Sequence, residues 1–192
     1  AIFHTDENVL LSASTASGKT EAAFFPILTL FSENPPTSVG AIYIGPLKAL
    51  INDQFLRLND LCAEADIPVW HWHGDVSQSH KAKMMKHPSG ILQITPESLE
   101  AMLLHKHAAI TKLFHDLRFI VIDEVHSLMR GDRGGQTICL IELMLFPIII
   151  DQIAYNPGSS HDHGLFAGNT EYKNQNVFQH GIFFTAIDRH QQ

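Results

Sequence analysis

Residues Asn8–Thr20, with the sequence NVLLSASTASGKT, determine the fold that we expect for this chain. A short apolar run, Val9–Leu11, precedes a loop of small residues that ends in Gly18-Lys19-Thr20, and a helical pattern follows from Glu21. The stretch therefore predicts a buried strand, a tight loop and a helix, in that order.

The residue types in this loop suit the binding of a triphosphate. Backbone N–H groups can converge on phosphate oxygens only where side chains are small, and the next helix directs its unpaired N–H groups at the same anion. Lys19 would reach the β- and γ-phosphates, and the Thr20 hydroxyl would ligate Mg²⁺. The usual pattern begins with Gly, whereas this one begins with Ala13, and the alternative is a turn before an exposed helix. We predict that ATP binds to seven residues, Ser14, Thr15, Ala16, Ser17, Gly18, Lys19 and Thr20.

Composition limits the classes of protein that fit. The 192 residues are enough for one domain, and the net charge of −7 gives no global basic field for nucleic acid, so such binding would need a local patch. Two cysteines in no metal or redox motif fit a reducing cytoplasm. The longest apolar stretch, residues 138–150, contains Glu142 and Pro147 and is too short for a bilayer, so we expect a cytoplasmic protein with no membrane contact.

Short apolar runs alternate with helical patterns along the chain. The runs have no polar alternation, which is typical of parallel strands buried on both faces, and they are Val39–Ile44, Val69–His73, Ile91–Ile94 and Phe119–Ile122. We therefore predict an α/β domain with a mostly parallel sheet and helices on both faces. Ligands of such sheets lie beyond the carboxyl ends of the strands, where the polar motifs of this sequence fall.

The last of these runs leads into acidic residues, in the sequence FIVIDEVH. An acid at the end of a buried strand beside a phosphate loop can hold Mg²⁺, and the next acid can orient and deprotonate the attacking water. We assign the first role to Asp123 and the second to Glu124, and we expect His126 to sense the γ-phosphate. The alternative is a strand that ends in a solvated acidic turn.

Four segments in order resemble superfamily 2 DExH-box helicases, most closely the Lhr (large helicase-related) branch. They are SASTASGKTEAAFFPIL, YIGPLKALINDQFLRL, WHGDVSQSHKAKMMKHPSGILQITPESLEAML and FIVIDEVHSLMRGDRGGQ. The resemblance implies the first RecA-like domain, a P-loop NTPase fold, of an ATP-driven helicase or translocase. It also implies contacts with one strand of DNA or RNA at Pro46, Leu47, Lys48, Gly74, Thr95, Pro96, Glu97 and Ser98.

The family pattern weakens after residue 145. We expect residues 1–145 to form the helicase domain and residues 146–192 a divergent tail from a truncated or frame-shifted gene, with a strand possible at Gly181–Ala186. Thr185-Ala186 is only a weak partial match to the Ser-Ala-Thr motif that should follow the acidic strand. We expect the second RecA-like domain of the family to be missing from this chain, and whether a partner chain supplies it stays open. Because that domain supplies an arginine finger, which contributes on the order of 10³–10⁵ in rate, we expect slow hydrolysis and no unwinding by this chain alone.

Two other functions fit parts of the sequence. A nucleotide-binding or interaction module without catalysis would keep the phosphate loop, and turnover would then not respond to Glu124→Gln. A small-molecule kinase could have the same loop but has no use for the PLKAL and TPES segments. The close pair His71 and His73 could bind a metal only with a third ligand nearby, so we interpret it as structural.

Overall fold

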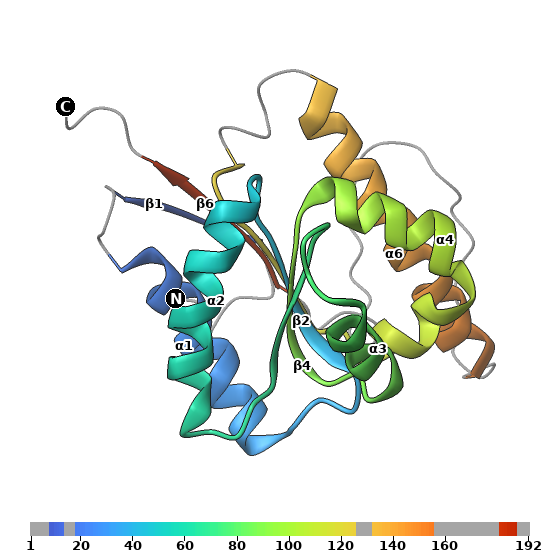
Figure 1. Cartoon of the computed structure of the whole chain (residues 1–192), viewed down its shortest axis with the longest axis horizontal. Coiled ribbons are helices and arrows are strands. Elements are labelled where there is room, and N and C mark those ends of the chain that lie inside the picture. The colour runs from blue at the N-terminus through green and yellow to red at the C-terminus, as the bar shows by residue number, and fades with distance from the viewer. Residues whose placement is uncertain (1–7, 14–17, 126–131, 156–180, 188–192) are drawn as a thin grey trace.

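The computed structural model describes residues 8–13, 18–125, 132–155 and 181–187, and Figure 1 shows their arrangement. The strands are β1 (Val9–Ala13), β2 (Val39–Ile44), β3 (Val69–Trp72), β4 (Gly90–Ile94), β5 (Phe119–Ile122) and β6 (Gly181–Ile187). The helices are α1 (Lys19–Glu33), α2 (Lys48–Ala63), α3 (Gln78–Lys86), α4 (Pro96–Phe114) and α6 (Asp132–Tyr155). Strands and helices alternate as the sequence predicts, and each predicted strand is present within one or two residues of its expected bounds.

The six strands form one sheet in the order β1-β6-β5-β2-β4-β3, and all neighbouring strands run parallel. Every residue of β2, β4 and β5 is buried. Apolar runs without alternation therefore mark strands that are covered on both faces, as expected of a parallel sheet. The predicted α/β fold is confirmed.

The two faces of the sheet carry separate hydrophobic cores. Alternate residues of a strand point to opposite faces, so Ala41 and Tyr43 pack in the core that includes residues of α1 and α2, whereas Ile42 and Ile44 pack with α3, α4 and α6. Figure 1 shows α1 and α2 on one side of the sheet and the other three helices opposite. Because helices cover both faces of the sheet, a ligand would reach the strands at the edge where their carboxyl ends lie.

The sheet includes a strand from the C-terminal part of the chain. The possible strand at Gly181–Ala186 is confirmed by β6, which pairs with both β1 and β5, so that Leu11 is level with Thr185 and Ile122 with Phe184. The helix α6 also runs through residue 145 and continues to Tyr155. Residues after the boundary expected at residue 145 are therefore part of the same sheet and of the helices that cover it.

Helix α6 is an element that we did not predict. Its buried residues Thr137, Leu140, Ile141 and Met144 follow a helical spacing of three and four, and α6 lies against α4. The aliphatic run at 138–150 obscured this periodicity because nearly every position in it is apolar. Within the ranges described, no helix is both long enough and apolar enough to span a membrane.

The start of β4 depends on a glycine. Gly90 has a φ of +68°, and a Cβ at this position would lie 2.1 Å from the carbonyl oxygen of Pro68. The same oxygen accepts a hydrogen bond of 2.9 Å from the Ile91 N–H, so it cannot move away without loss of that bond. Only glycine combines this backbone conformation with so close an approach.

Candidate nucleotide and nucleic-acid site

The parallel sheet brings the carboxyl ends of all its strands to one edge. The residues predicted to act on ATP follow β1 and β5, which are separated in the sheet only by β6. The segments predicted to contact nucleic acid follow β2, β4 and β3, on the other side of β5. With a spacing of roughly 5 Å between strands, the ends of β1 and β5 are separated by about 10 Å across the sheet.

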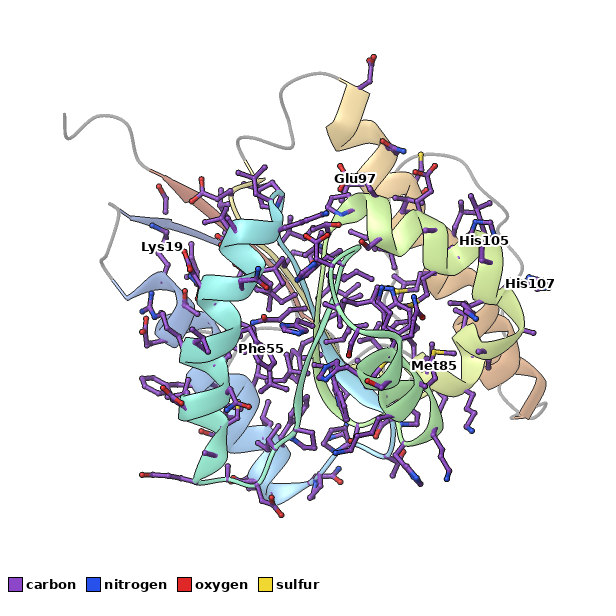
Figure 2. All side chains as sticks on the ribbon, in the orientation of Figure 1. Lys19, Phe55, Met85, Glu97, His105 and His107 are labelled. Carbon is purple, nitrogen blue, oxygen red and sulfur yellow. The ribbon has the colours of Figure 1, made fainter. Side chains whose placement is uncertain are left out.

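Lys19 and Thr20 form the start of α1. Gly18, at the N-cap of this helix, has a φ of +83°, and no side chain caps the helix. Glycine adopts the left-handed conformation without the steric cost of a Cβ. The first N–H groups of α1, which follow Gly18, have no acceptor within the helix. Lys19 and Thr20 are both half-buried, and Figure 2 shows Lys19 on the first turn of α1. Ser14, Thr15, Ala16 and Ser17 lie outside the described residues.

Asp123 follows the last residue of β5 and makes hydrogen bonds through its backbone N–H and both of its carboxylate oxygens. Its N–H donates to the Ile44 carbonyl at 2.9 Å, which continues the ladder between β5 and β2. Its Oδ1 accepts from the Glu124 N–H at 2.8 Å, and its Oδ2 accepts from the Tyr43 hydroxyl. Burial raises the pKa of Tyr43 well above its usual value, and the nearby charge of Asp123 adds to the effect, so the phenol stays protonated as a donor.

Glu124 has an unusual backbone conformation. Its φ of +50° lies in the left-handed region, which costs a residue with a Cβ roughly 1–2 kcal/mol. Non-glycine residues in this conformation gather at functional sites, where the surrounding structure enforces it. The turn places the half-buried Glu124 beside Asp123 at the sheet edge. His126 lies outside the described residues.

An ion pair joins the start of α1 to α2. The Arg57 guanidinium donates to a carboxylate oxygen of Glu21, in the first turn of α1. A hydrogen bond from its own backbone and the neighbouring Arg57 lower the pKa of Glu21, against the effect of desolvation. Neither residue was predicted to belong to the site. Their sequence positions gave no signal, because they are separated by 36 residues and meet only when the two helices cover the same face.

Lys48 and Gly74, two of the residues predicted to contact nucleic acid, lie together. The Lys48 Nζ is 3.3 Å from the point where a Cβ on Gly74 would lie, and it bonds to both carboxylate oxygens of Asp75 at 3.2 Å. Leu47, the N-cap of α2, is exposed and provides no side-chain cap. The structure therefore presents Lys48 at the sheet edge but pairs it with an acid, Asp75, that was not among the predicted site residues.

The start of α4 is capped, as expected, by Thr95. Its hydroxyl accepts from the Ser98 N–H at 3.3 Å, and Pro96 occupies the first helical position. The Ser98 N–H is therefore occupied by the cap, and Pro96 has no N–H, so a phosphate at this helix start would have to bind through other groups. Glu97 is exposed here, as Figure 2 shows, and its negative charge does not favour phosphate.

Three histidines lie next to one another at the edge of the sheet. The ring centroid of His71 is 5.4 Å from that of His73 and 5.1 Å from that of His80. Desolvation and the neighbouring histidines lower the pKa of His71 to about 4. His73 shares a hydrogen bond of 2.9 Å with Asn52. In the described part of the chain, no group of three histidines, cysteines or acids has a geometry that could hold a metal ion.

Comparisons with known proteins agree with this arrangement. The family model for "DEAD/DEAH box helicase" matches residues 1–153. The chain is 35% identical over 150 residues to the ATP-dependent helicase Lhr-Core of Sulfolobus acidocaldarius, an alignment that covers 71% of this chain and 17% of the relative. The chain therefore spans about a sixth of the length of the curated relatives it matches.

Two solved structures share the fold. The helicase MrfA bound to DNA and AMPPNP is 27% identical with a TM-score of 0.66, over 94% of this chain and 22% of that one. The Mycobacterium smegmatis helicase Lhr bound to ssDNA and AMP-PNP is 25% identical with a TM-score of 0.64, over 93% of this chain and 21% of that one. The resemblance to the Lhr branch and the RecA-like fold is confirmed, and the chain belongs to the DEAD/DEAH box helicase family.

Proposed function

We propose that this chain is the ATP-binding RecA-like domain of a DExH-type helicase or translocase that acts on single-stranded DNA or RNA. One observation carries the proposal: Lys19, at the start of α1 after β1, and the acids after β5 lie at the same edge of one parallel sheet, with only β6 between their strands. Loop-type triphosphatases need this pair of features to hold a nucleotide and its metal ion.

The residues present fit Mg²⁺. A hydroxyl from Thr20 and a carboxylate from Asp123 are oxygen ligands, which Mg²⁺ prefers, and it usually takes one or two protein ligands beside phosphates and water. When bound, the ion would neutralise charge on the phosphate oxygens. Lys19 and the residues from Ser14 to Gly18 would bind the phosphates. Glu124 would orient the attacking water and accept its proton, and His126 would sense the γ-phosphate.

The nucleic-acid strand would lie across the carboxyl ends of β2, β4 and β3. Lys48 is a cation at this edge, and the first turn of α2 adds N–H groups that no side chain caps. The residues proposed for this contact are Pro46, Leu47, Lys48, Gly74, Thr95, Pro96, Glu97 and Ser98. MrfA and Lhr were solved with DNA bound, which supports nucleic acid as the partner of this fold.

A second RecA-like domain would complete the site. The matched relatives are much longer than the aligned region, which leaves room for such a domain in them. Without an arginine finger and an opposing wall, this chain alone would bind ATP weakly, hydrolyse it slowly and not unwind a duplex. The alternative function, a nucleotide-binding or interaction module without catalysis, predicts binding with no turnover at all.

The test is ATP turnover by this chain with and without single-stranded DNA or RNA. We expect a low rate that the polymer raises, and that falls to background in Lys19→Ala and Glu124→Gln. Lys112→Ala, an equal loss of charge at an exposed position of α4, is the matched control and should not change the rate. ATP binding without turnover would favour the non-catalytic module, and no binding would refute both.

A further inference from the structure

Tyr43 and Asp123 form a hydrogen bond between β2 and β5. The Tyr43 hydroxyl donates to Asp123 Oδ2, and the Glu124 N–H donates to Oδ1 at 2.8 Å. Donors at both oxygens fix the rotation of the carboxylate about its axis. An ionised carboxylate has about four lone-pair sites, so accepting these two bonds is compatible with binding a cation as well.

The register of the sheet explains how residues 80 positions apart meet. Tyr43 is level with Val121 on β5, and residues two apart on a strand share a face, so Asp123 follows one step along on the same face. The Tyr43 side chain is 2% exposed, and its ring lies 6.1 Å from that of Phe24 on α1. Its phenol is therefore held in one direction, toward the end of β5.

A buried hydroxyl at this position needs a reason. The strand reads VGAIYI, and Phe would fill the same space without the cost of taking a polar group out of water. The hydrogen bond offsets that cost only because Asp123 accepts it. We therefore attribute the hydroxyl to its hydrogen bond with the Asp123 carboxylate, and not to the packing of the core.

We propose that Tyr43 is a positioning residue that orients the Asp123 carboxylate to bind Mg²⁺ in the complex with nucleotide. The inference rests on the proposed function, since it assumes that Asp123 is a metal ligand. Hydrogen-bond partners of a ligating carboxylate commonly contribute 10- to 100-fold to metal affinity, so loss of the Tyr43 hydroxyl should weaken the metal about 10-fold. Affinity for nucleotide without metal should stay the same, because the proposed role of Tyr43 is exerted only through the carboxylate that binds the metal.

The direct test compares wild type with Tyr43→Phe, which removes only the hydroxyl. Mn²⁺ replaces Mg²⁺ because free Mn²⁺ can be counted by electron paramagnetic resonance, and its affinity is measured with saturating AMP-PNP. Nucleotide affinity is measured separately in EDTA, with a fluorescent ATP analogue. Tyr155→Phe, the same change at the last residue of α6, is the matched control, and Asp123→Asn sets the effect of losing the carboxylate charge.

The expected result is an approximately 10-fold loss of Mn²⁺ affinity in Tyr43→Phe, with no change in EDTA and none in Tyr155→Phe. Unchanged Mn²⁺ affinity would overturn the inference and leave the proposed function intact. An equal loss with and without metal would also overturn it, since Tyr43 would then support the nucleotide site as a whole. Wild type that binds neither AMP-PNP nor Mn²⁺ would overturn the proposed function and the inference together.

A second measurement does not depend on the folding of Tyr43→Phe. The chain has three tyrosines, so the variant Tyr155→Phe/Tyr172→Phe, labelled with 3-fluorotyrosine, carries one fluorine reporter, at Tyr43. With AMP-PNP already bound, addition of Mg²⁺ should shift the ¹⁹F resonance, because the ion withdraws charge from the carboxylate that accepts its hydrogen bond. A resonance that does not move at saturating Mg²⁺ would refute the role of Tyr43.

Discussion

The ion pair between Lys48 and Asp75 should restrain the binding of nucleic acid. Lys48 lies within the segments proposed to contact a phosphate backbone, and both carboxylate oxygens of Asp75 bond to its ammonium group at 3.2 Å. A phosphate must compete with this carboxylate for the same ammonium. We therefore expect Asp75→Asn to raise the affinity for single-stranded DNA or RNA.

The size of the gain follows from the exposure of the pair. The side chains are 52% and 72% exposed, and exposed ion pairs contribute about 0.2–1 kcal/mol, which corresponds to roughly a 1.5- to 5-fold gain in affinity. Removal of the carboxylate also removes its repulsion of phosphate, which acts in the same direction and is screened beyond about 10 Å at 0.1 M salt. The gain should therefore shrink as salt is added.

Fluorescence anisotropy with a labelled single-stranded oligonucleotide, at several salt concentrations, measures the effect. One more phosphate contact by Lys48 should steepen the slope of log affinity against log salt by about 0.7. Asp60→Asn, at an exposed position of α2, changes the net charge equally and is the control. A gain that persists when Lys48→Ala is added, or an equal gain in Asp60→Asn, would refute the reasoning, since the effect would then come from overall charge.

Four further predictions concern the stability of the domain. Gly90→Ala should destabilise it by roughly 3 kcal/mol in urea unfolding, from the positive φ and the backbone clash, whereas Gly135→Ala, with open space in α6, should stabilise it by up to about 1 kcal/mol. Thr95→Ala should cost about 1 kcal/mol through loss of the α4 cap, and Thr95→Ser should retain most of it. Because the pKa of His71 falls from 6.5 to about 4 on folding, the unfolded chain binds more protons between these values, so stability should fall as pH drops from about 6.5 to 4. The ring is half-exposed, so we expect on the order of 1–2 kcal/mol, and His71→Phe should flatten the profile by that amount while other groups titrate as before.

The sequence predicts the sheet well because a strand that is buried on both faces appears as an uninterrupted apolar run. Strands such as β2 and β5 must be apolar at every position, so their runs stand out without knowledge of their neighbours. The ends of the strands are equally visible, since polar residues resume there. The positions of Lys19 and Asp123 at one edge followed from these two facts and the rule that parallel strands align their carboxyl ends.

The contacts between motifs could not be predicted in the same way. The bond from Tyr43 to Asp123 depends on which strands are neighbours and on their register, and a single sequence contains neither. Helix α6 was missed for a different reason. Its spacing of buried residues is present in the sequence, but Gly134 and Gly135 are typical of loops, and the apolar run after them hides the polar face.

The order of the strands puts the proposed nucleotide and nucleic-acid sites on adjoining halves of one edge, and β5 and β2 form the boundary. Coupling between the two proposed sites would be carried by elements that belong to both halves. Such coupling is reciprocal, so each ligand would change the binding affinity of the other by the same factor. Besides the backbone ladder between β5 and β2, side-chain hydrogen bonds cross the boundary: Tyr43 to Asp123 within the sheet, and Arg57 to Glu21 between α2 and α1. The first is buried and rigid, and the second is half-exposed and weaker, because solvent screens it. Under the proposed function, movement of Asp123 toward a metal ion would be transmitted to β2, the strand that precedes Lys48, more strongly than movement of α1 would be transmitted to α2.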